Sequence, residues 1–262
     1  MASRANDNER IILAFDAYGT LLSTESIAQK LASHFGEKKA GTIATTWRKY
    51  QLEYTWRLTS MDFSTVTRSS LKHALRESGV FLDDTQTEEM LEAYDSLTCF
   101  RDVEKTMQRL KSVPDIKAVV FSNGTHSMVS RSVKNSPDLS QHVETFQDIV
   151  VVEEVKKYKP APEAYYHLAK KVGKDADDAK QMSQIWLVSG NPFDVVGARA
   201  VGMNAIWVDR AGNGWQDRLI GGEKGRPTEI VRSLDEVVST VMSINSDELT
   251  QNWREMHGER DV

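Results

Sequence analysis

Asp16 is the residue whose setting most clearly points to chemistry in this sequence. Residues 11–15 are apolar and lead straight into Asp16, and Gly19 and Thr20 follow within the next few positions. The pattern predicts a buried strand that delivers a carboxylate to its own carboxyl end. That edge is where open α/β sheets bind ligands. An aspartate in this place also simply caps a turn, and the motif taken alone leaves that alternative open.

Polar or charged residues also follow three other predicted strands. Each group alone fits ordinary turn or helix-start chemistry. Because the carboxyl ends of parallel strands meet at one edge of a sheet, their joint occurrence with Asp16 and Thr20 predicts a single site there. They are Ser122 and Asn123 after residues 116–121, Lys159 after residues 148–152, and Ser189, Asn191 and Asp194 after residues 185–188.

The chain from Asp102 onward alternates helical and strand patterns, which implies parallel strands joined by crossover helices. Residues 205–208 are expected to form the last strand, ahead of a glycine-rich stretch at 210–225. Helices are expected at 103–111, 126–134, 163–172, 193–200 and 234–244.

Residues 23–96 look helical instead. Apolar residues recur there at three- and four-residue spacing, as at Ile27, Leu31 and Phe35. Four helices are expected, at about 26–35, 40–59, 64–78 and 87–97.

The predicted fold class is therefore α/β, a doubly wound parallel sheet interrupted after its first strand by a helical insertion. We expect the insertion to cover the carboxyl edge of the sheet as a cap. In this division residues 1–22 and 100–250 form the core domain, residues 23–99 the cap domain, and residues 251–262 a polar C-terminal tail.

The composition excludes several classes of partner. A net charge of -5 argues against nucleic-acid binding, and a small-molecule partner fits better. Cys99 is the only cysteine, so neither an intrachain disulfide nor a multi-cysteine metal cluster is expected, and a reducing compartment is favoured. No apolar run is long enough to span a bilayer, and the first ten residues lack the apolar segment of a signal peptide. We expect a cytoplasmic protein with no membrane partner.

Four motifs occur in order, with the helical insertion after the first: F-D-A-Y-G-T-L, S-N-G, K-P and S-G-N-P-F-D. Together they resemble the haloacid dehalogenase superfamily, whose core is Rossmann-like. In the insertion, W-R-K-Y-Q-L-E-Y-T-W at residues 47–56 is similar to the signature of the type II enzymes, which hydrolyse (S)-2-haloalkanoates. The resemblance covers residues 11–241, most of the chain.

The resemblance implies hydrolytic dehalogenation of short (S)-2-haloalkanoic acids to (R)-2-hydroxy acids, with no metal or other cofactor. Asp16 would attack C2 of the substrate in line, expel halide and form an ester that water then hydrolyses. Lys159 and Thr20 would hold Asp16 ionised and aimed.

The other motif residues receive roles from the same resemblance. Asp194, helped by Ser189 and Asn191, would position or activate the hydrolytic water. Ser122 and Asn123, with backbone N–H groups at a helix start, would bind the substrate carboxylate.

Arg48 is the expected acceptor of the departing halide, because a weakly hydrated guanidinium stabilises a leaving anion in a dry pocket. Gln51 and Tyr54 follow at three-residue spacing and would share its helix face. A solvated helix arginine is the alternative for Arg48. Four aromatic residues match positions that line or brace the site in the family, although their rings also suit an ordinary core: Tyr18, Phe63, Tyr165 and Phe193.

A magnesium-dependent phosphatase is the main alternative function. Phosphotransferases of the superfamily generally carry a second aspartate two residues after the first, where this chain has Tyr18, a poor general acid at neutral pH. Gly190 also stands where they usually have an acid, which leaves Asp194 as the main acid of that motif. Both departures weaken the phosphatase alternative. Gly190 and Pro192 depart from the dehalogenase pattern too, and they leave the substrate range open.

Two further alternatives concern what the site is for. A non-catalytic interaction module would have lost the motif residues, but Asp16, Lys159 and Asp194 are all present. A hydrolase of an unknown small metabolite stays open. A homodimer is possible, since dimers are common in the family and the long helix of the insertion has an apolar face, although packing within the chain explains that face equally well.

Overall fold

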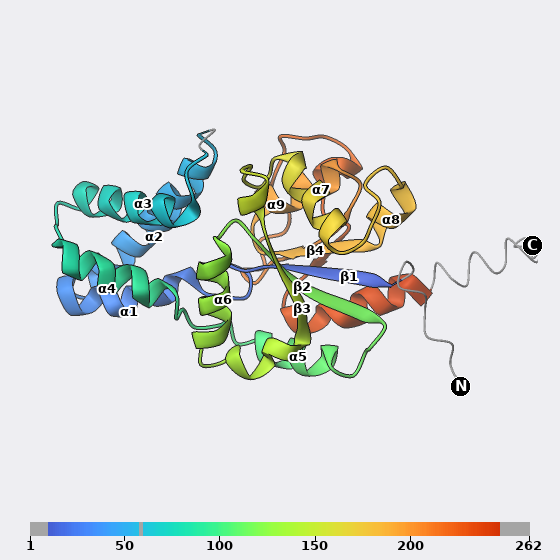
Figure 1. The fold of residues 1–262 in the computed structure, drawn as a ribbon, viewed down its shortest axis with the longest axis horizontal. Coiled ribbons are helices and arrows are strands. Elements are labelled where there is room, and N and C mark those ends of the chain that lie inside the picture. The colour runs from blue at the N-terminus through green and yellow to red at the C-terminus, as the bar shows by residue number, and fades with distance from the viewer. Residues whose placement is uncertain (1–9, 58–59, 247–262) are drawn as a thin grey trace, which may run out of the picture.

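A parallel sheet forms the centre of the protein. The computed structural model describes residues 10–57 and 60–246. Within them six parallel strands follow the order β3-β2-β1-β4-β5-β6 (Figure 1). The first strand of the chain is thus an interior strand, as in a doubly wound sheet. The strands are β1 (Ile11–Asp16), β2 (Ile116–Ser122), β3 (Phe146–Val151), β4 (Ile185–Ser189), β5 (Asn204–Val208) and β6 (Glu229–Val231).

Strand β1 fixes the direction of Asp16. Ile12 and Ala14 pack in one buried apolar cluster, and Leu13 and Phe15 belong to the cluster on the opposite face. Because side chains alternate along a strand, Asp16 points to the face of Ile12 and Ala14. That face is covered by α7 (Pro162–Lys171), α8 (Ala179–Ser183) and α9 (Pro192–Ala200). The strand therefore delivers its carboxylate toward α7 and α9.

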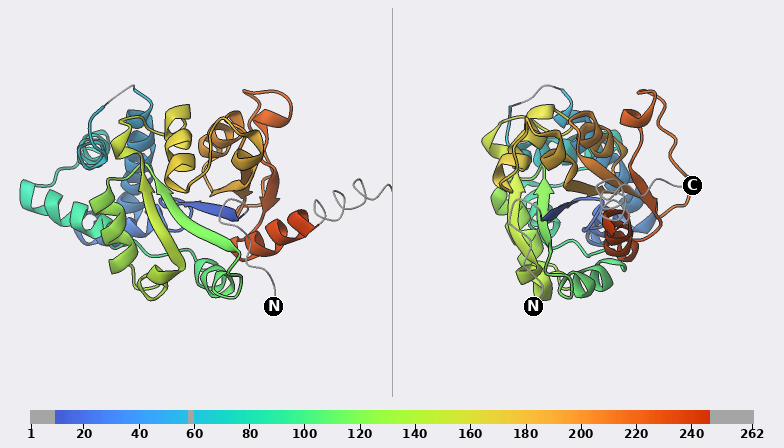
Figure 2. Two further views of the ribbon diagram at one scale, coloured as in Figure 1. Left: turned by 45° about the vertical axis from the view of Figure 1, so that its right-hand side comes forward. Right: turned by 90° about the vertical axis from the view of Figure 1, so that its right-hand side faces the viewer.

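The opposite face of the sheet is covered by another helical layer (Figure 2). It contains α5 (Val103–Leu110), α6 (His126–Asn135) and a helix over residues 237–246. Their apolar side chains, such as Met107, Val129 and Val238, join Leu13 and Phe15 in one core. Both faces of the sheet are thus buried, as a parallel sheet requires.

The helices between β1 and α5 gather at one end of the molecule, at the left of Figure 1. Their bounds lie a few residues from the predicted ones, because side-chain caps set the starts of α3 and α4: Asp62 accepts a hydrogen bond from Thr65 N, and Asp83 forms a capping box with Gln86. Residues 58–59 of one predicted helix lie outside the described residues. The helices are α1 (Ile27–Phe35), α2 (Glu37–Thr55), α3 (Phe63–Glu77) and α4 (Asp84–Tyr94).

The two chain segments that connect these helices to the sheet lie side by side. Leu22 and Cys99 form an antiparallel bridge. Ser23 N donates to Thr98 O at 2.8 Å, and Phe100 N donates to Leu21 O at 3.1 Å. The insertion therefore leaves and rejoins the sheet at one place.

The prediction that residues 205–208 form the last strand was wrong. Strand β6 follows the glycine-rich stretch and pairs in parallel with β5, with Trp207 opposite Ile230. It has three residues, too few for a periodic pattern to be recognised. The five-residue helix α8 was missed for the same reason. The predicted C-terminal tail, residues 251–262, lies outside the described residues.

Candidate active site

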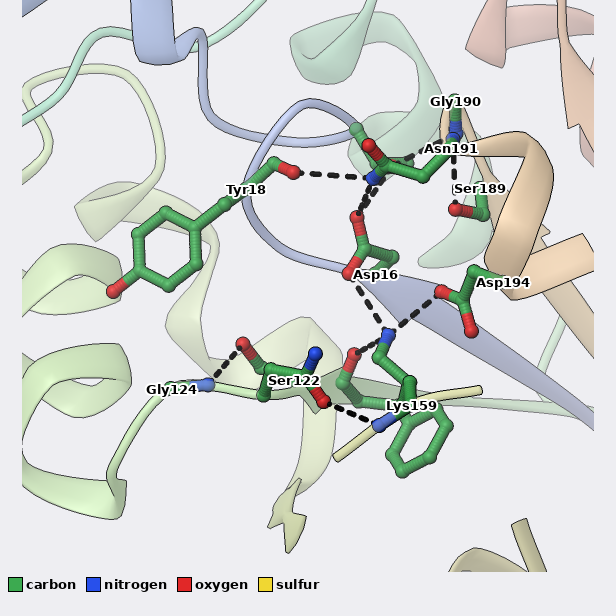
Figure 3. A network of polar contacts seen from close by, with 12 residues as sticks. Asp16, Tyr18, Ser122, Gly124, Lys159, Ser189, Gly190, Asn191 and Asp194 are labelled. Atoms are coloured by element: carbon green, nitrogen blue, oxygen red, sulfur yellow. Dashed lines mark hydrogen bonds and ion pairs between the residues drawn. The ribbon is translucent and has the colours of Figure 1, made fainter. Parts of the chain in front are cut away.

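Asp16 ends β1 with both carboxylate oxygens engaged (Figure 3). Its Oδ1 accepts a hydrogen bond from Lys159 Nζ at 2.9 Å. Its Oδ2 accepts from Thr20 Oγ1 at 2.8 Å and from Asn191 Nδ2 at 2.9 Å. Only 6% of the residue is exposed. Donors from three loops thus fix the orientation of a nearly buried carboxylate.

Lys159 connects two carboxylates. Its Nζ donates to Asp16, to Asp194 Oδ2 at 2.7 Å and to the backbone oxygen of Phe121 at 3.0 Å. An ammonium group has three N–H donors, so all three are used. Burial disfavours the charge, but the two carboxylates outweigh burial and hold the pKa of Lys159 above its ordinary value. The lysine therefore stays cationic through neutral pH.

Asp194 lies in the first turn of α9 and has no exposed surface. Tyr165, on α7, donates its hydroxyl to Asp194 Oδ1 at 2.8 Å and to Asp194 O at 3.1 Å. Burial raises the pKa of Asp194, and the charge of Lys159 acts in the opposite direction. Asp194 is therefore a buried carboxylate supported by one cation and one phenol.

In this structure the side chain of Asn191 contacts Asp16. Besides Asp16, its Nδ2 donates to Tyr18 O at 3.2 Å. Ser189 Oγ accepts from Asn191 N at 3.1 Å, so Ser189 holds the loop that carries the amide. Ser189 and Asn191 were predicted to assist Asp194, whereas in the structure the Asn191 amide donates to Asp16 and Ser189 holds the Asn191 backbone.

Two glycines allow the β1 and β4 loops to touch. Gly19 has φ +93, a conformation that favours glycine. A Cβ on Gly190 would lie 2.7 Å from Gly19 O, so only glycine fits at this approach. Gly190 N donates to Thr20 Oγ1 at 2.9 Å. Glycine at position 190, which departs from the family pattern, thus allows the two loops to make direct contact.

Arg48 reaches these loops from α2. Its Nη2 donates to Tyr18 O at 2.8 Å and lies 3.4 Å from Asn191 Oδ1, and its Nη1 donates to Gln51 Oε1 at 2.7 Å. Arg48 is thus a site-facing cation and not a solvated helix arginine. Tyr54, expected on the same face, instead pairs with His73 of α3 at 2.9 Å.

Aromatic rings form a wall beside Arg48. Tyr18 stacks on Phe63 at 6.0 Å and meets Tyr94 at 5.3 Å, and its hydroxyl lies 3.3 Å from Ser132 Oγ. Tyr94 also donates to Gln51 Oε1 at 3.0 Å. Burial raises the pKa of both tyrosines, so their phenols stay neutral. Sequence reasoning missed Tyr94, because its helical spacing is that of a core residue.

Ser122 and Asn123 use their side chains to hold backbone groups. Ser122 Oγ accepts from Gly124 N at 3.1 Å, and Asn123 Oδ1 accepts from Lys159 N at 2.9 Å. Phe193 packs edge-on against Trp56, at the end of α2, at 5.5 Å. These contacts place all three predicted residues at the same sheet edge or beside it.

A cavity of about 200 Å³ lies between the insertion and the core loops. Its walls include Phe63 on one side and Asn123 and Tyr158 on the other. Tyr158, which was not among the predicted site residues, donates to Met61 O at 2.6 Å across this boundary. The cavity therefore ends beside residues that contact Tyr18 and Lys159.

Within residues 10–57 and 60–246, no three His, Cys, Asp or Glu side chains cluster in a way that could hold a metal ion. In the same residues, no helix has the length and apolar content needed to cross a membrane.

Residues 12–202 match the haloacid dehalogenase-like hydrolase family. The chain is 30% identical over 227 residues to the (S)-2-haloacid dehalogenase of Pseudomonas fluorescens, covering 85% of this chain and 92% of that protein. It is 31% identical to (S)-2-haloacid dehalogenase H-109 of Pseudomonas putida, covering 86% and 95% of the two chains.

The fold has solved counterparts. The L-2-haloacid dehalogenase of Xanthobacter autotrophicus, solved with chloropropionic acid covalently bound, superposes with a TM-score of 0.76 at 24% identity, over 89% of this chain and 98% of that one. The family match and the coverage of the relatives agree with the strand-end motifs. The chain therefore belongs to the haloacid dehalogenase-like hydrolases and, within them, to the (S)-2-haloacid dehalogenases.

Proposed function

We propose that this protein hydrolyses short (S)-2-haloalkanoic acids to (R)-2-hydroxy acids through an ester on Asp16. The observation that carries the proposal is the Asn191 side chain, which donates to Asp16 Oδ2 at 2.9 Å while Arg48 approaches its oxygen at 3.4 Å. A carboxylate nucleophile and a guanidinium that can receive an anion thus flank the same amide. Displacement of halide from carbon uses a nucleophile for the carbon and an acceptor for the leaving anion, and these two groups supply them.

In the first step Asp16 attacks C2 of the substrate. Oδ2 accepts two hydrogen bonds and Oδ1 one among the described residues, so Oδ1 keeps the lone pair available for attack. The new bond joins Oδ1 to C2, the carbon–halogen bond breaks, and the halide leaves with its electron pair toward Arg48. Attack from the side opposite the halogen inverts the configuration at C2.

In the second step water attacks the Cγ atom of the ester on Asp16. Asp194 takes the proton from this water, since Lys159 and Tyr165 both support its ionised form. As the Cγ–Oδ1 bond breaks, Oδ1 takes up the proton that Asp194 accepted and leaves as the hydroxyl oxygen of the product, while the second proton of the water is released to solvent as Asp16 regains its carboxylate. The regenerated Asp16 therefore contains one oxygen atom from water.

The loop at residues 122–125 is the proposed site for the substrate carboxylate. Ser122 and Asn123 order this loop, and Thr125 caps the first turn of α6. N–H groups at a helix start favour an anion. Tyr18, Phe63 and Phe193 would then enclose the carbon chain.

The proposed reaction needs no metal. Lys159 places its ammonium group between Asp16 and Asp194 and supplies the positive charge that both carboxylates need. Tyr18 stands where the phosphotransferases hold a second aspartate. These two features support a metal-free displacement over phosphoryl transfer.

Residues 23–99 are proposed to act as a cap domain over a core of residues 1–22 and 100–250. The bridge between Leu22 and Cys99 supports these boundaries, because both connections meet there. The 200 Å³ cavity between insertion and core is the proposed entrance, and its size favours short acids.

The mouth of this entrance suits an anion. Lys156 and Lys157 line the cavity and are exposed. The acids beside them are engaged at helix starts: Asp62 accepts from Thr65 N and Glu153 from His126 N. The helix starts offset part of the charge of these two acids, and the two lysines would attract a carboxylate substrate.

A cytoplasmic location and a homodimer complete the proposal. The apolar face of α2, with Ile43 and Trp47, is buried within the chain, so it does not serve as a dimer surface. The homodimer therefore rests on family resemblance alone. Light scattering coupled to size-exclusion chromatography would test it, and a monomeric mass would contradict it.

The function is tested by halide release from (S)-2-chloropropionate and bromoacetate in EDTA, beside p-nitrophenyl phosphate hydrolysis in Mg²⁺. Wild type should release halide in EDTA, and Asp16→Asn should not. Phosphate release alone would contradict the proposal and favour the phosphatase. A kcat/KM on short haloacids far below about 10⁴ M⁻¹s⁻¹ would favour an unknown metabolite instead.

A further inference from the structure

Helix α9 carries a glycine one turn after Asp194. Gly197 is buried within Pro192–Ala200, with helix on both sides. Glycine inside a helix is unfavourable, because it loses more backbone freedom on folding than other residues do. A buried helical glycine therefore calls for a steric reason.

The reason is the hydroxyl of Tyr165. A Cβ placed on Gly197 would lie 2.3 Å from the hydroxyl oxygen of Tyr165, 2.6 Å from its Cζ and 2.7 Å from its Cε2. These distances are far shorter than any real carbon contact. The tyrosine ring has no exposed surface and packs edge-on against Phe121 at 5.6 Å. It therefore cannot swing away without disturbing the core.

The missing side chain lets the phenol touch the backbone of α9. From that position Tyr165 donates to both the side chain and the backbone oxygen of Asp194, at 2.8 and 3.1 Å. The second carboxylate oxygen of Asp194 accepts from Lys159. Displacing the phenol would leave the fully buried Asp194 with one fewer donor, which favours its protonated form.

We propose that Gly197 is a positioning residue, whose missing side chain seats the Tyr165 hydroxyl on Asp194 and so keeps Asp194 ionised for ester hydrolysis. The kinetic part of this inference rests on the proposed function. The steric part does not, and it is tested without substrate.

A second helical glycine provides the matched control. Gly41 lies within α2 (Glu37–Thr55), and a Cβ there would meet no atom within 4 Å. Gly41→Ala makes the same chemical change in a helix without any steric conflict. It should leave both the tyrosine contact and the activity unchanged.

The substrate-free test follows the phenol directly. Tyrosine labelled with a heavy carbon isotope at Cζ gives one resonance per residue, and Tyr165→Phe identifies that of Tyr165. In Gly197→Ala this resonance should shift, whereas in Gly41→Ala it should not. An unchanged Tyr165 resonance in Gly197→Ala would overturn the proposal, whatever the enzyme turns over.

The kinetic test separates the two chemical steps in a single turnover. In Gly197→Ala the first halide release should stay close to wild type, while hydrolysis of the ester slows by about 10- to 100-fold. The acid limb of the pH–rate profile should move to higher pH, by the same amount as in Tyr165→Phe. Equal slowing of both steps with an unmoved pH profile would mean a merely structural role and overturn the inference.

A third variant covers the case in which Gly197→Ala does not fold. Tyr165→Leu removes the hydroxyl and the distal ring atoms, so Gly197→Ala should fold normally in that background. Failure to fold there as well would show that Gly197 is needed for another reason, and the proposal would be wrong. Inactivity of the wild type toward haloacids would refute the proposed function only, since the resonance test still decides the steric inference.

Discussion

The two sides of the site are built in different ways. On the core side Asp16, Lys159 and Asp194 are 6%, 1% and 0% exposed, and Lys159 bridges the two carboxylates. On the insertion side Arg48 comes from a separate group of helices and meets the core at Tyr18 O and Asn191. The sheet thus sets the geometry of the nucleophile, whereas the helices supply the group for the leaving anion. Damage to the core side should stop chemistry, and damage to the insertion side should weaken it.

Asp16→Asn should have the largest effect. An amide is a poor nucleophile, so turnover should fall by at least about 10⁴-fold. Halide release measures the loss. Asp148→Asn, an exposed aspartate on β3, is the matched control and should behave like wild type. Turnover near the wild-type rate in Asp16→Asn would show that Asp16 is not the nucleophile.

Arg48→Lys should lower kcat by about 10²- to 10³-fold, because lysine lacks the planar fork that faces Asn191 and Gln51. Steady-state halide release from chloro and bromo substrates measures it. Arg68→Lys is the control, since Arg68 pairs with Glu88 on the surface of the insertion. If both variants keep normal rates, the insertion does not supply the anion acceptor.

The pH dependence of ester hydrolysis should follow Asp194. Its ionised form is the active one, and burial raises its pKa, so the rate should begin to fall at a higher pH than an ordinary aspartate would give. Below that pKa the rate should drop about tenfold per pH unit. Single-turnover decay of the ester measures this limb. A rate that stays flat down to the ordinary range of aspartate would show that another group takes the proton.

Lys156→Glu combined with Lys157→Glu should have the smallest effect. The kcat/KM for haloacids should fall by about two- to fivefold at low salt, and the difference should shrink as salt screens the charges. Reversal of Lys170 and Lys180, which do not line the cavity, controls for net charge. Equal losses in both double variants would mean that the cavity is not the entrance.

Much of the core side could be predicted from the sequence, because it is local. An apolar strand that ends in Asp16 places a carboxylate at a sheet edge, and the ends of parallel strands must meet there. The contacts of Lys159 and Asn191 with Asp16 agree with that reasoning. Whether Asn191 contacts Asp16 or Asp194 depends on the conformation of the loop after Gly190. The strand pattern does not predict that conformation.

The insertion side was less predictable, because helix packing decides which face of α2 meets the core. Arg48 and Tyr54 are six residues apart on one helix, yet one faces Asn191 and the other His73. Tyr94 has the spacing of an ordinary core residue and Gly197 is a glycine within a predicted helix, so neither position indicates its partner. Their roles follow from partners more than 30 residues away in sequence, at Gln51 and Tyr165.

The ester on Asp16 is the central claim, and a single turnover in water enriched in heavy oxygen tests it most directly. With enzyme in excess, the tryptic peptide of residues 11–30 should gain one heavy oxygen, located at Asp16, and the hydroxy acid should contain none. Heavy oxygen in the hydroxy acid, with an unlabelled peptide, would show that water attacks the substrate directly and would contradict the account.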